Sequence, residues 1–216
     1  MKDWADDHPK AKLMGRNRAA ILEAARSAFL SVGYEGASMD AIAQGAGVSI
    51  MTLYRHAPSK DDLFETVILN ACNHAQHDDG ERTAALLEQP LSDLLVTIGD
   101  LFQAKMSSDD TLALFRAVIV EMRRFPHLAQ AACSGLVEAW SVNLDALLAA
   151  KPELSAVAGD ARREMLAEFF DGLVGTDILR TLLGTPKLPV EQQKIRSRTA
   201  ADKFVMAATR CGLVQG

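Results

Sequence analysis

The stretch Ala37–Lys60, ASMDAIAQGAGVSIMTLYRHAPSK, decides the fold of this 216-residue chain. Ser38 is a favourable N-cap for a first short helix that continues to Ala43. Gly45 and Gly47 then end this helix, because glycine tolerates the positive φ that a helix C-terminus requires.

A second short helix follows the two glycines. Ser49 is its N-cap, the helix is expected over Ile50–Arg55, and Pro58 closes it. Two short helices joined by a glycine-containing turn form a helix-turn-helix, whose second helix enters the major groove of DNA. The pattern therefore indicates DNA binding.

The stretch resembles the DNA-binding domain of the TetR/AcrR family of bacterial transcriptional repressors. The shared pattern is IAxxAGVS, TLYRH and SKxxL, which lies here at Ile42–Ala43, Ala46–Ser49, Thr52–His56 and Ser59–Leu63. The string GYEGAS at residues 33–38 resembles the family too. The resemblance implies a helix-turn-helix DNA-binding domain at residues 14–60 and an effector-binding and dimerisation domain at residues 61–216.

The remaining pattern is helical, because alternating β-branched runs are absent. Apolar residues recur at helical spacing over 16–33, ending at Gly33, and a long helix is expected from Lys60 towards Leu87 with a weak point at 77–80. Prolines separate further helices. We expect an all-α protein of about nine helices, the later ones at 91–106, 109–124, 126–150, 160–184 and 190–212.

Charge is unevenly distributed along the chain. The net charge is −5, yet residues 10–60 hold seven Lys or Arg residues against three acids. A basic domain on an acidic body suits a protein that contacts phosphates through one face, and chance clustering is the alternative.

The chain is expected to be cytoplasmic and not to bind membranes. Cys72, Cys133 and Cys211 have no CxxC spacing, which is typical of a reducing compartment. The opening MKDWADDHPK resembles neither a signal peptide nor an anchor. No apolar run approaches the roughly 20 residues that span a bilayer.

The second short helix carries the residues expected to read bases. Ser49, Ile50, Met51 and Thr52 form its N-terminal end, which faces base edges in a helix-turn-helix. Ile50 and Met51 are apolar and suit thymine methyl groups, although Met51 has intramolecular packing as its alternative. Arg55 suits either a guanine edge or a phosphate.

Further positions are expected to contact phosphate. The resemblance implies this role for Thr52, Tyr54, His56 and Lys60, and Ser38 at a helix N-terminus suits it as well. The alternatives are a surface histidine at position 56 and a solvated charge at position 60.

Several neighbouring positions bear on whether the residues act as they do in the family. Arg16 and Arg18 are candidates for an additional backbone contact or a solvated face. Two positions depart from the family pattern: Ala57 replaces a common aromatic residue, and Asp40 places an acid near the DNA backbone.

Specific binding requires two half-sites, so a homodimer on a palindromic double-stranded operator is expected. In the family the last two helices of each subunit form the interface. Apolar bands here match that arrangement, and an ordinary intramolecular core is the alternative. The candidate dimer residues are Phe169, Phe170, Leu173, Val174, Ile178, Phe204 and Val205.

The middle helices are where the family holds a small effector. An apolar pocket for a hydrophobic or amphipathic small molecule is expected here, with ordinary core packing as the alternative. Glu121 is expected to pair with Arg124 or to be solvated. The candidate pocket residues are Phe102, Met106, Phe115, Met122 and Trp140.

No catalytic residue, cofactor or metal is expected. His74, His77 and His127 lack the further ligands that would complete a metal site. The sequence has no GxGxxG, P-loop, HExxH or nucleophile elbow, which argues against an enzyme. The favoured function is a ligand-responsive repressor released from its operator by the effector. The alternative is an effector-independent DNA-binding regulator or architectural protein.

Overall fold

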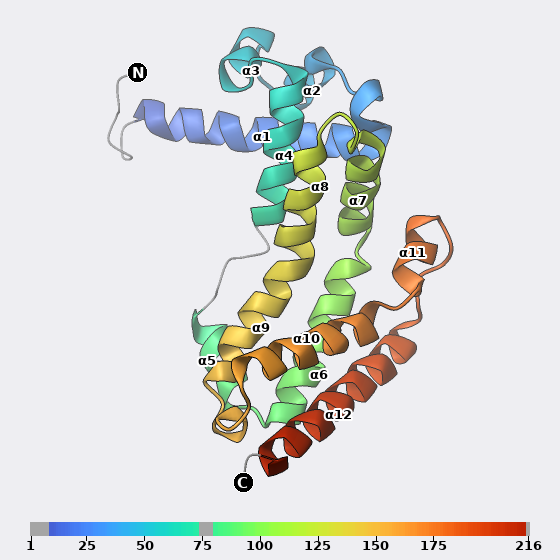
Figure 1. Ribbon diagram of the computed structural model, residues 1–216. Helices are drawn as coiled ribbons and strands as arrows, with labels where there is room; N and C mark the ends of the chain where they lie inside the picture. Colours follow the sequence, from blue (N-terminus) through green and yellow to red (C-terminus); the bar gives the residue numbers. More distant parts are fainter. Residues whose placement is uncertain (1–8, 74–79, 215–216) are drawn as a thin grey trace. The chain divides into compact units, whose positions relative to one another are not determined.

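A computed structural model describes residues 9–73 and 80–214 of the chain. Every regular element in these residues is helical, so the predicted all-α class is confirmed (Figure 1). A π-helical turn joins α8 to α9, and a short 3₁₀ turn follows α9. The helices are α1 (Pro9–Gly36), α2 (Met39–Gly45), α3 (Ile50–His56), α4 (Lys60–Asn73), α5 (Gly80–Glu88), α6 (Leu91–Met106), α7 (Asp109–Glu121), α8 (Pro126–Cys133), α9 (Ala139–Ala149), α10 (Gly159–Val174), α11 (Asp177–Leu182) and α12 (Val190–Val214).

The chain divides into two compact units. Of the described residues, the first unit holds 9–73 and 113–132, and the second holds 80–112 and 133–214. Helix α7 therefore begins in the second unit and ends in the first. The predicted DNA-binding domain, residues 14–60, lies within the first unit, which also includes α4, most of α7 and most of α8.

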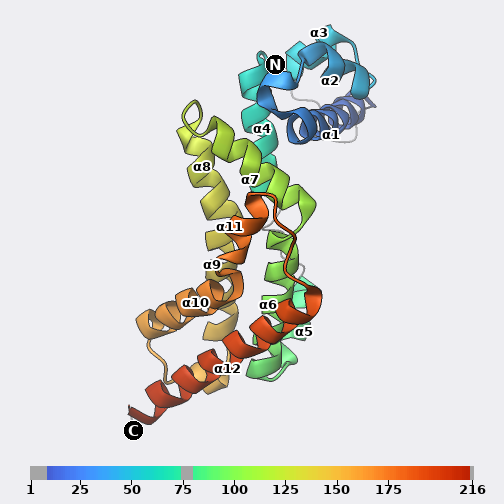
Figure 2. The ribbon, with the colours of Figure 1, turned by 90° about the vertical axis from the view of Figure 1, so that its right-hand side faces the viewer.

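The core of the first unit forms where α1 packs against α2 and α4 (Figures 1 and 2). Phe29 from α1, Ile42 from α2 and Leu53 from α3 are all almost fully buried. Phe64 of α4 meets Phe29 edge to face, with ring centroids 5.1 Å apart. Aromatic pairs of this geometry are favourable beyond the area they bury.

Helix α1 of the first unit starts earlier than expected, and the helix expected from Lys60 passes through residues outside the described ranges. Helix α1 begins at Pro9, earlier than the predicted residue 16, because proline is well suited to the first turn of a helix. Its regular part ends at Gly33, as predicted, where φ is +75°. The predicted long helix from Lys60 is described as α4 and α5, and the predicted weak point at 77–80 falls largely in residues 74–79, outside the described ranges.

In the second unit α12 packs along α6 and α10 (Figure 2). Gly99 of α6 permits the closest approach, because a Cβ there would lie 3.0 Å from the Ser197 hydroxyl oxygen. The Gln103 side-chain amide donates to the same hydroxyl at 2.8 Å and to the Gln193 carbonyl at 2.7 Å. A buried polar network thus fixes the register of α6 and α12.

The prediction of one helix over 160–184 was wrong. Helix α10 ends at Val174, Gly175 adopts φ +53°, and α11 starts at Asp177. Arg196 of α12 closes this break: its Nη1 donates to the Leu173 and Val174 carbonyls, and its Nη2 pairs with Asp177. The predicted helices 126–150 and 109–124 also differ, since the π-helical turn interrupts the first and the second ends at Glu121.

None of the helices within residues 9–73 and 80–214 combines the length and apolar character needed to cross a bilayer.

Candidate nucleic-acid interface

The helix-turn-helix is built as its local sequence predicts. The backbone N–H of Ala41 donates to the Ser38 hydroxyl at 3.2 Å, and that of Thr52 donates to the Ser49 hydroxyl at 3.1 Å. Both serines are therefore true N-caps. Of the two glycines in the turn only Gly47 has a positive φ, +65°, so the left-handed conformation belongs to that residue alone.

Helix α3 presents one face to the core and one outward. Leu53 is completely buried, whereas Met51 is 76% exposed and Tyr54 is 46% exposed. Arg55 is exposed beside them. Met51 and Arg55 are four residues apart and so share the outer helical face. The apolar Met51 on that face therefore buries little of its surface within the free chain.

The remaining predicted contacts surround this face in two groups. Ser38 and Ser49 are exposed at the starts of α2 and α3. The partly buried members of the predicted set are Ile50, Thr52, His56 and Lys60.

The side chains of Arg18 and Arg55 place positive charge near His56 at the C-terminal end of α3. Burial lowers the pKa of His56, and the positive charges of Arg55 and Arg18 lower it further. Its Nε2 is buried without a hydrogen-bond partner. Within the described residues neither Arg18 nor Arg55 forms an ion pair with an acid. Positive charge without an internal partner is what a phosphate-binding surface requires.

Lys60 is held inside the protein. Its ammonium donates to the Ala37 carbonyl at 2.8 Å and to the Glu35 carbonyl at 3.3 Å, and it lies 4.4 Å from the centre of the Tyr34 ring. The predicted phosphate contact of this side chain would therefore compete with three internal contacts.

The two departures from the family pattern have clear local surroundings. Ala57 is buried, and its N–H closes α3 by donating to the Leu53 carbonyl at 2.9 Å. Asp40 is exposed in the first turn of α2, where a carboxylate favours the helix dipole.

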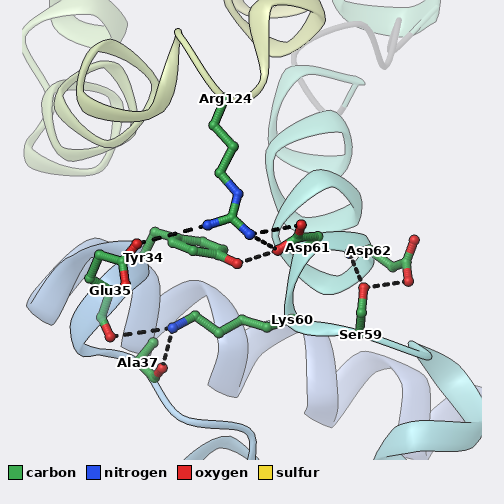
Figure 3. Close-up of polar contacts among 8 residues, drawn as sticks. All are labelled: Tyr34, Glu35, Ala37, Ser59, Lys60, Asp61, Asp62 and Arg124. Atoms are coloured by element: carbon green, nitrogen blue, oxygen red, sulfur yellow. Dashed lines mark hydrogen bonds and ion pairs between the residues drawn. The ribbon is translucent and has the colours of Figure 1, made fainter.

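A polar cluster at the base of the helix-turn-helix was missed by the sequence reasoning (Figure 3). Tyr34 donates its hydroxyl to Asp61, and Arg124 donates to both carboxylate oxygens of Asp61 at 2.8 and 2.9 Å. Arg124 was expected as a partner of Glu121, and no partner was expected for Asp61. The contacts join residues 27 and 63 positions apart, so no local signal reveals them.

These contacts alter the ionisation of all three groups. Burial, aided by the hydrogen bond to Asp61, raises the pKa of Tyr34 to about 12. The hydrogen bonds from Tyr34 and then from Arg124 lower the pKa of Asp61. The bond to Asp61 raises the pKa of Arg124. The cluster is therefore a neutral phenol between a carboxylate and a guanidinium throughout the physiological range.

The candidate effector residues are divided between the two units. Phe102, Met106 and Trp140 belong to the second unit, where Phe102 meets Trp140 edge to face at 5.5 Å. Phe115 and Met122 belong to the first unit, and Met122 is 49% exposed.

Phe102 and Met106 do line a cavity. It has a volume of about 40 Å³, and its polar lining includes Gln103, Asp177 and Arg196. This volume accommodates about one or two waters rather than an effector, which requires about 300 Å³ or more. An effector would have to widen it.

The candidate dimer residues mostly serve the fold of one chain. Phe169, Phe170, Leu173 and Phe204 are buried between helices of the second unit, whereas Val174, Ile178 and Val205 are partly exposed. A groove of about 80 Å³ runs between α10 and α12, lined by Phe169, Gly172 and Phe204 among others. Ile195 and Met206 of α12 are 66% and 56% exposed, so apolar surface remains available on this helix.

Of the three histidines considered for a metal, the structure describes His127 alone. His127 lies 3.4 Å from the Glu65 carboxylate, whereas His74 and His77 fall outside the described residues.

Two family models match this chain, one over the helix-turn-helix and one over much of the remaining sequence. Residues 21–67 match the model of the bacterial regulatory proteins of the tetR family, and residues 93–209 match the C-terminal domain of the AefR-like transcriptional repressors. The HTH-type transcriptional regulator UidR of Escherichia coli (strain K12) is 38% identical over 74 residues. That alignment covers 34% of this chain and about a third, 34%, of UidR.

Solved structures show the same fold over most of the chain. A TetR-family transcriptional regulator of Mesorhizobium loti MAFF303099 is 23% identical with a TM-score of 0.78, covering 89% of this chain and 96% of its own. The flavonoid-responsive regulator FrrA is 28% identical with a TM-score of 0.65 and the same coverage of both chains.

The fold and the exposed second helix define a helix-turn-helix DNA-binding transcription regulator. Because the matched C-terminal domain spans more than half of the sequence and the tetR model covers the helix-turn-helix, the chain belongs to the TetR family of transcriptional regulators.

Proposed function

We propose that the chain is a repressor that binds a palindromic operator as a homodimer and leaves it when a small hydrophobic or amphipathic effector binds. The observation that carries the DNA-binding part is the outer face of α3. There an exposed methionine, an exposed tyrosine and an arginine that pairs with no acid among the described residues occupy one helix surface. These groups are suited to thymine methyls, phosphates and guanine edges.

Dimerisation supplies what one helix-turn-helix lacks. A single module makes few contacts, and two half-sites multiply its specificity. The partly exposed Val174 and Val205, together with the exposed Ile195 and Met206, give α10 and α12 an apolar surface for a second copy. Four such helices would form the interface.

Effector binding is supported by the residues that line the cavity and by one related protein. The cavity beside Phe102 and Met106 is bordered by the Asp177–Arg196 ion pair, so its lining is amphipathic. FrrA, which is flavonoid-responsive by name, is 28% identical over 89% of this chain. A planar, largely apolar molecule with a few polar groups fits both observations, and its binding would shift the population towards a conformation that binds DNA poorly.

The test uses a duplex selected from a random pool by the wild-type protein. Sedimentation should give a dimer at micromolar concentration, and fluorescence anisotropy should show affinity that falls with salt. Arg55→Ala should reduce the magnitude of the salt slope by about 0.9 if Arg55 contacts a phosphate. Arg123→Ala is the matched control, because Arg123 is also exposed and carries the same charge away from α3.

The effector part is tested by titrating a panel of flavonoids into the protein–DNA complex. Release of the duplex by a member of the panel, with matching thermal stabilisation of the free protein, would support ligand-responsive repression. DNA binding that persists unchanged across flavonoids and other amphipathic aromatic compounds would favour the effector-independent regulator. A monomer, or equal affinity for every duplex, would contradict the proposal as a whole.

A further inference from the structure

The helix-turn-helix segment is closed at its base by contacts between its two ends. Residues 34–37 precede α2, and residues 60–61 follow α3. Lys60 donates to the carbonyls of Glu35 and Ala37, and Tyr34 donates to Asp61. The two ends of the segment that carries α3, the expected recognition helix, are therefore held together at one point by these hydrogen bonds (Figure 3).

Arg124 contacts both sides of this point from a distant part of the sequence. Its guanidinium donates two bonds to Asp61 on the α4 side and lies 3.8 Å from the Glu35 carboxylate on the α1 side. Its Cζ lies over the Tyr34 ring, 4.7 Å from the ring centre. Figure 3 shows Arg124 reaching down between these partners from the connection between α7 and α8.

The connection that carries Arg124 is itself anchored. Phe125 is buried, and its ring centroid lies 5.8 Å from that of Tyr34 and 5.4 Å from that of Phe64. Arg124 also lies over Phe125, 5.3 Å from the ring centre. Apolar packing of Phe125 thus holds the backbone at Arg124 in place, and from there the Arg124 side chain donates its two hydrogen bonds to Asp61.

We propose that Arg124 is a positioning residue for DNA recognition, which sets the orientation of the helix-turn-helix relative to α7 and α8 through Asp61 and Tyr34. This inference rests on the DNA-binding function proposed above. Arg124 acts on the operator through the base of the segment and not by contacting DNA.

The chemistry of the side chain favours this role. A planar guanidinium can direct its two terminal nitrogens at different carboxylates, here Nη2 at Asp61 and Nη1 at Glu35, while its carbon lies over an aromatic ring, which fixes direction as well as distance. Lysine retains the charge but loses both features. The Arg124 and Asp61 side chains are 46% and 43% exposed, and exposed ion pairs contribute little to folding stability. Loss of Arg124 should therefore change geometry more than folding.

The experiment compares Arg124→Ala, Arg124→Lys and Tyr34→Phe with the wild type. Arg123→Ala is the control, because it removes the same charge from the neighbouring exposed residue. Affinity is measured by anisotropy on the duplex selected by the wild type and on a scrambled duplex, each over a salt series. Hydrogen exchange of the free proteins is followed at residues 34–37 and 60–63.

Arg124→Ala should weaken specific binding about tenfold and leave binding to the scrambled duplex unchanged. The salt slope should stay at its wild-type value, because no phosphate contact is lost. Arg124→Lys should recover only part of the loss, and Tyr34→Phe, which removes a single hydroxyl, should show a smaller loss of the same kind. Exchange at the base should be faster in Arg124→Ala than in Arg123→Ala.

Three results would overturn the inference. One is unchanged specific affinity in Arg124→Ala on a duplex that the wild type prefers. A second is a salt slope reduced by about 0.9, which would make Arg124 a direct phosphate contact. The third is equal exchange at the base in the Arg124 and Arg123 variants. A wild-type protein without any sequence preference would instead overturn the proposed function, so the two failures are distinguishable.

Discussion

Replacement of Met51 by alanine tests how the recognition helix reads bases. Met51 is 76% exposed in the free protein, so alanine removes almost no intramolecular contact and keeps the helix propensity high. The free energy of unfolding should change by no more than about 0.5 kcal/mol. Any larger loss in DNA affinity then reports a contact made with DNA.

The expected magnitude follows from the exposed area. Full burial of a methionine side chain contributes about 1.5–3 kcal/mol, and about three quarters of Met51 is available for burial by DNA. Removal of that contribution should cost about 1–2 kcal/mol of binding. This corresponds to an increase in Kd of about five- to thirtyfold.

The assay combines the protein variant with removal of methyl groups from the DNA. Each thymine of the selected duplex is replaced in turn by uracil, and Kd is measured by anisotropy for wild type and Met51→Ala. At the contacted position the two changes should be strongly non-additive, because each removes the same contact. Met122→Ala is the control, since Met122 is another exposed methionine and lies outside α3. Additive losses at every thymine, or a change in Kd below about twofold in Met51→Ala, would refute the reasoning.

Three further outcomes are expected. Gly47→Ala should destabilise the protein by about 1–2 kcal/mol in urea unfolding, because the φ of +65° at Gly47 is unfavourable for alanine. The control Gly15→Ala, at an open helical position, should be neutral or stabilising, and equal effects of the two substitutions would contradict this account of the turn. Folding stability should fall as the pH drops below 6.5, the ordinary pKa of histidine, because burial lowers the pKa of His56 in the folded state and the unfolded chain then binds more protons. His56→Gln should flatten this part of the pH profile in thermal melts. An unchanged profile would exclude His56 as the cause of the pH dependence. Lys60→Met should lower the free energy of unfolding by about 1–2 kcal/mol and leave the salt slope of DNA binding intact, because the Lys60 ammonium bonds the Glu35 and Ala37 carbonyls. A slope reduced by about 0.9 would contradict this and support the predicted phosphate contact of Lys60.

The helix-turn-helix was predictable because its determinants are local. Ser38 and Ser49 bond backbone groups three residues ahead, and the positive φ of Gly47 lies between two short apolar patterns. Such signals act over a few residues and are legible without tertiary structure. The bounds of α3 and α6 accordingly agree with expectation to within one residue.

The features that distant residues decide could not be foreseen from the sequence. The break after Val174 depends on Arg196, which satisfies carbonyls about twenty positions away. The internal bonds of Lys60 and the pairing of Asp61 with Arg124 likewise join residues far apart in sequence. A charged residue near a helix start looks the same in sequence whether it faces solvent, a phosphate or a partner from another helix.

Selection of duplexes from a random pool by the wild-type protein, followed by sequencing, tests the central claim most directly. If α3 reads bases, the selected pool should converge on two inverted half-sites. Their centres should lie about one helical turn, 34–36 Å, or a multiple of it apart. A selected pool that remains as diverse as the starting pool would contradict sequence-specific DNA recognition by this chain.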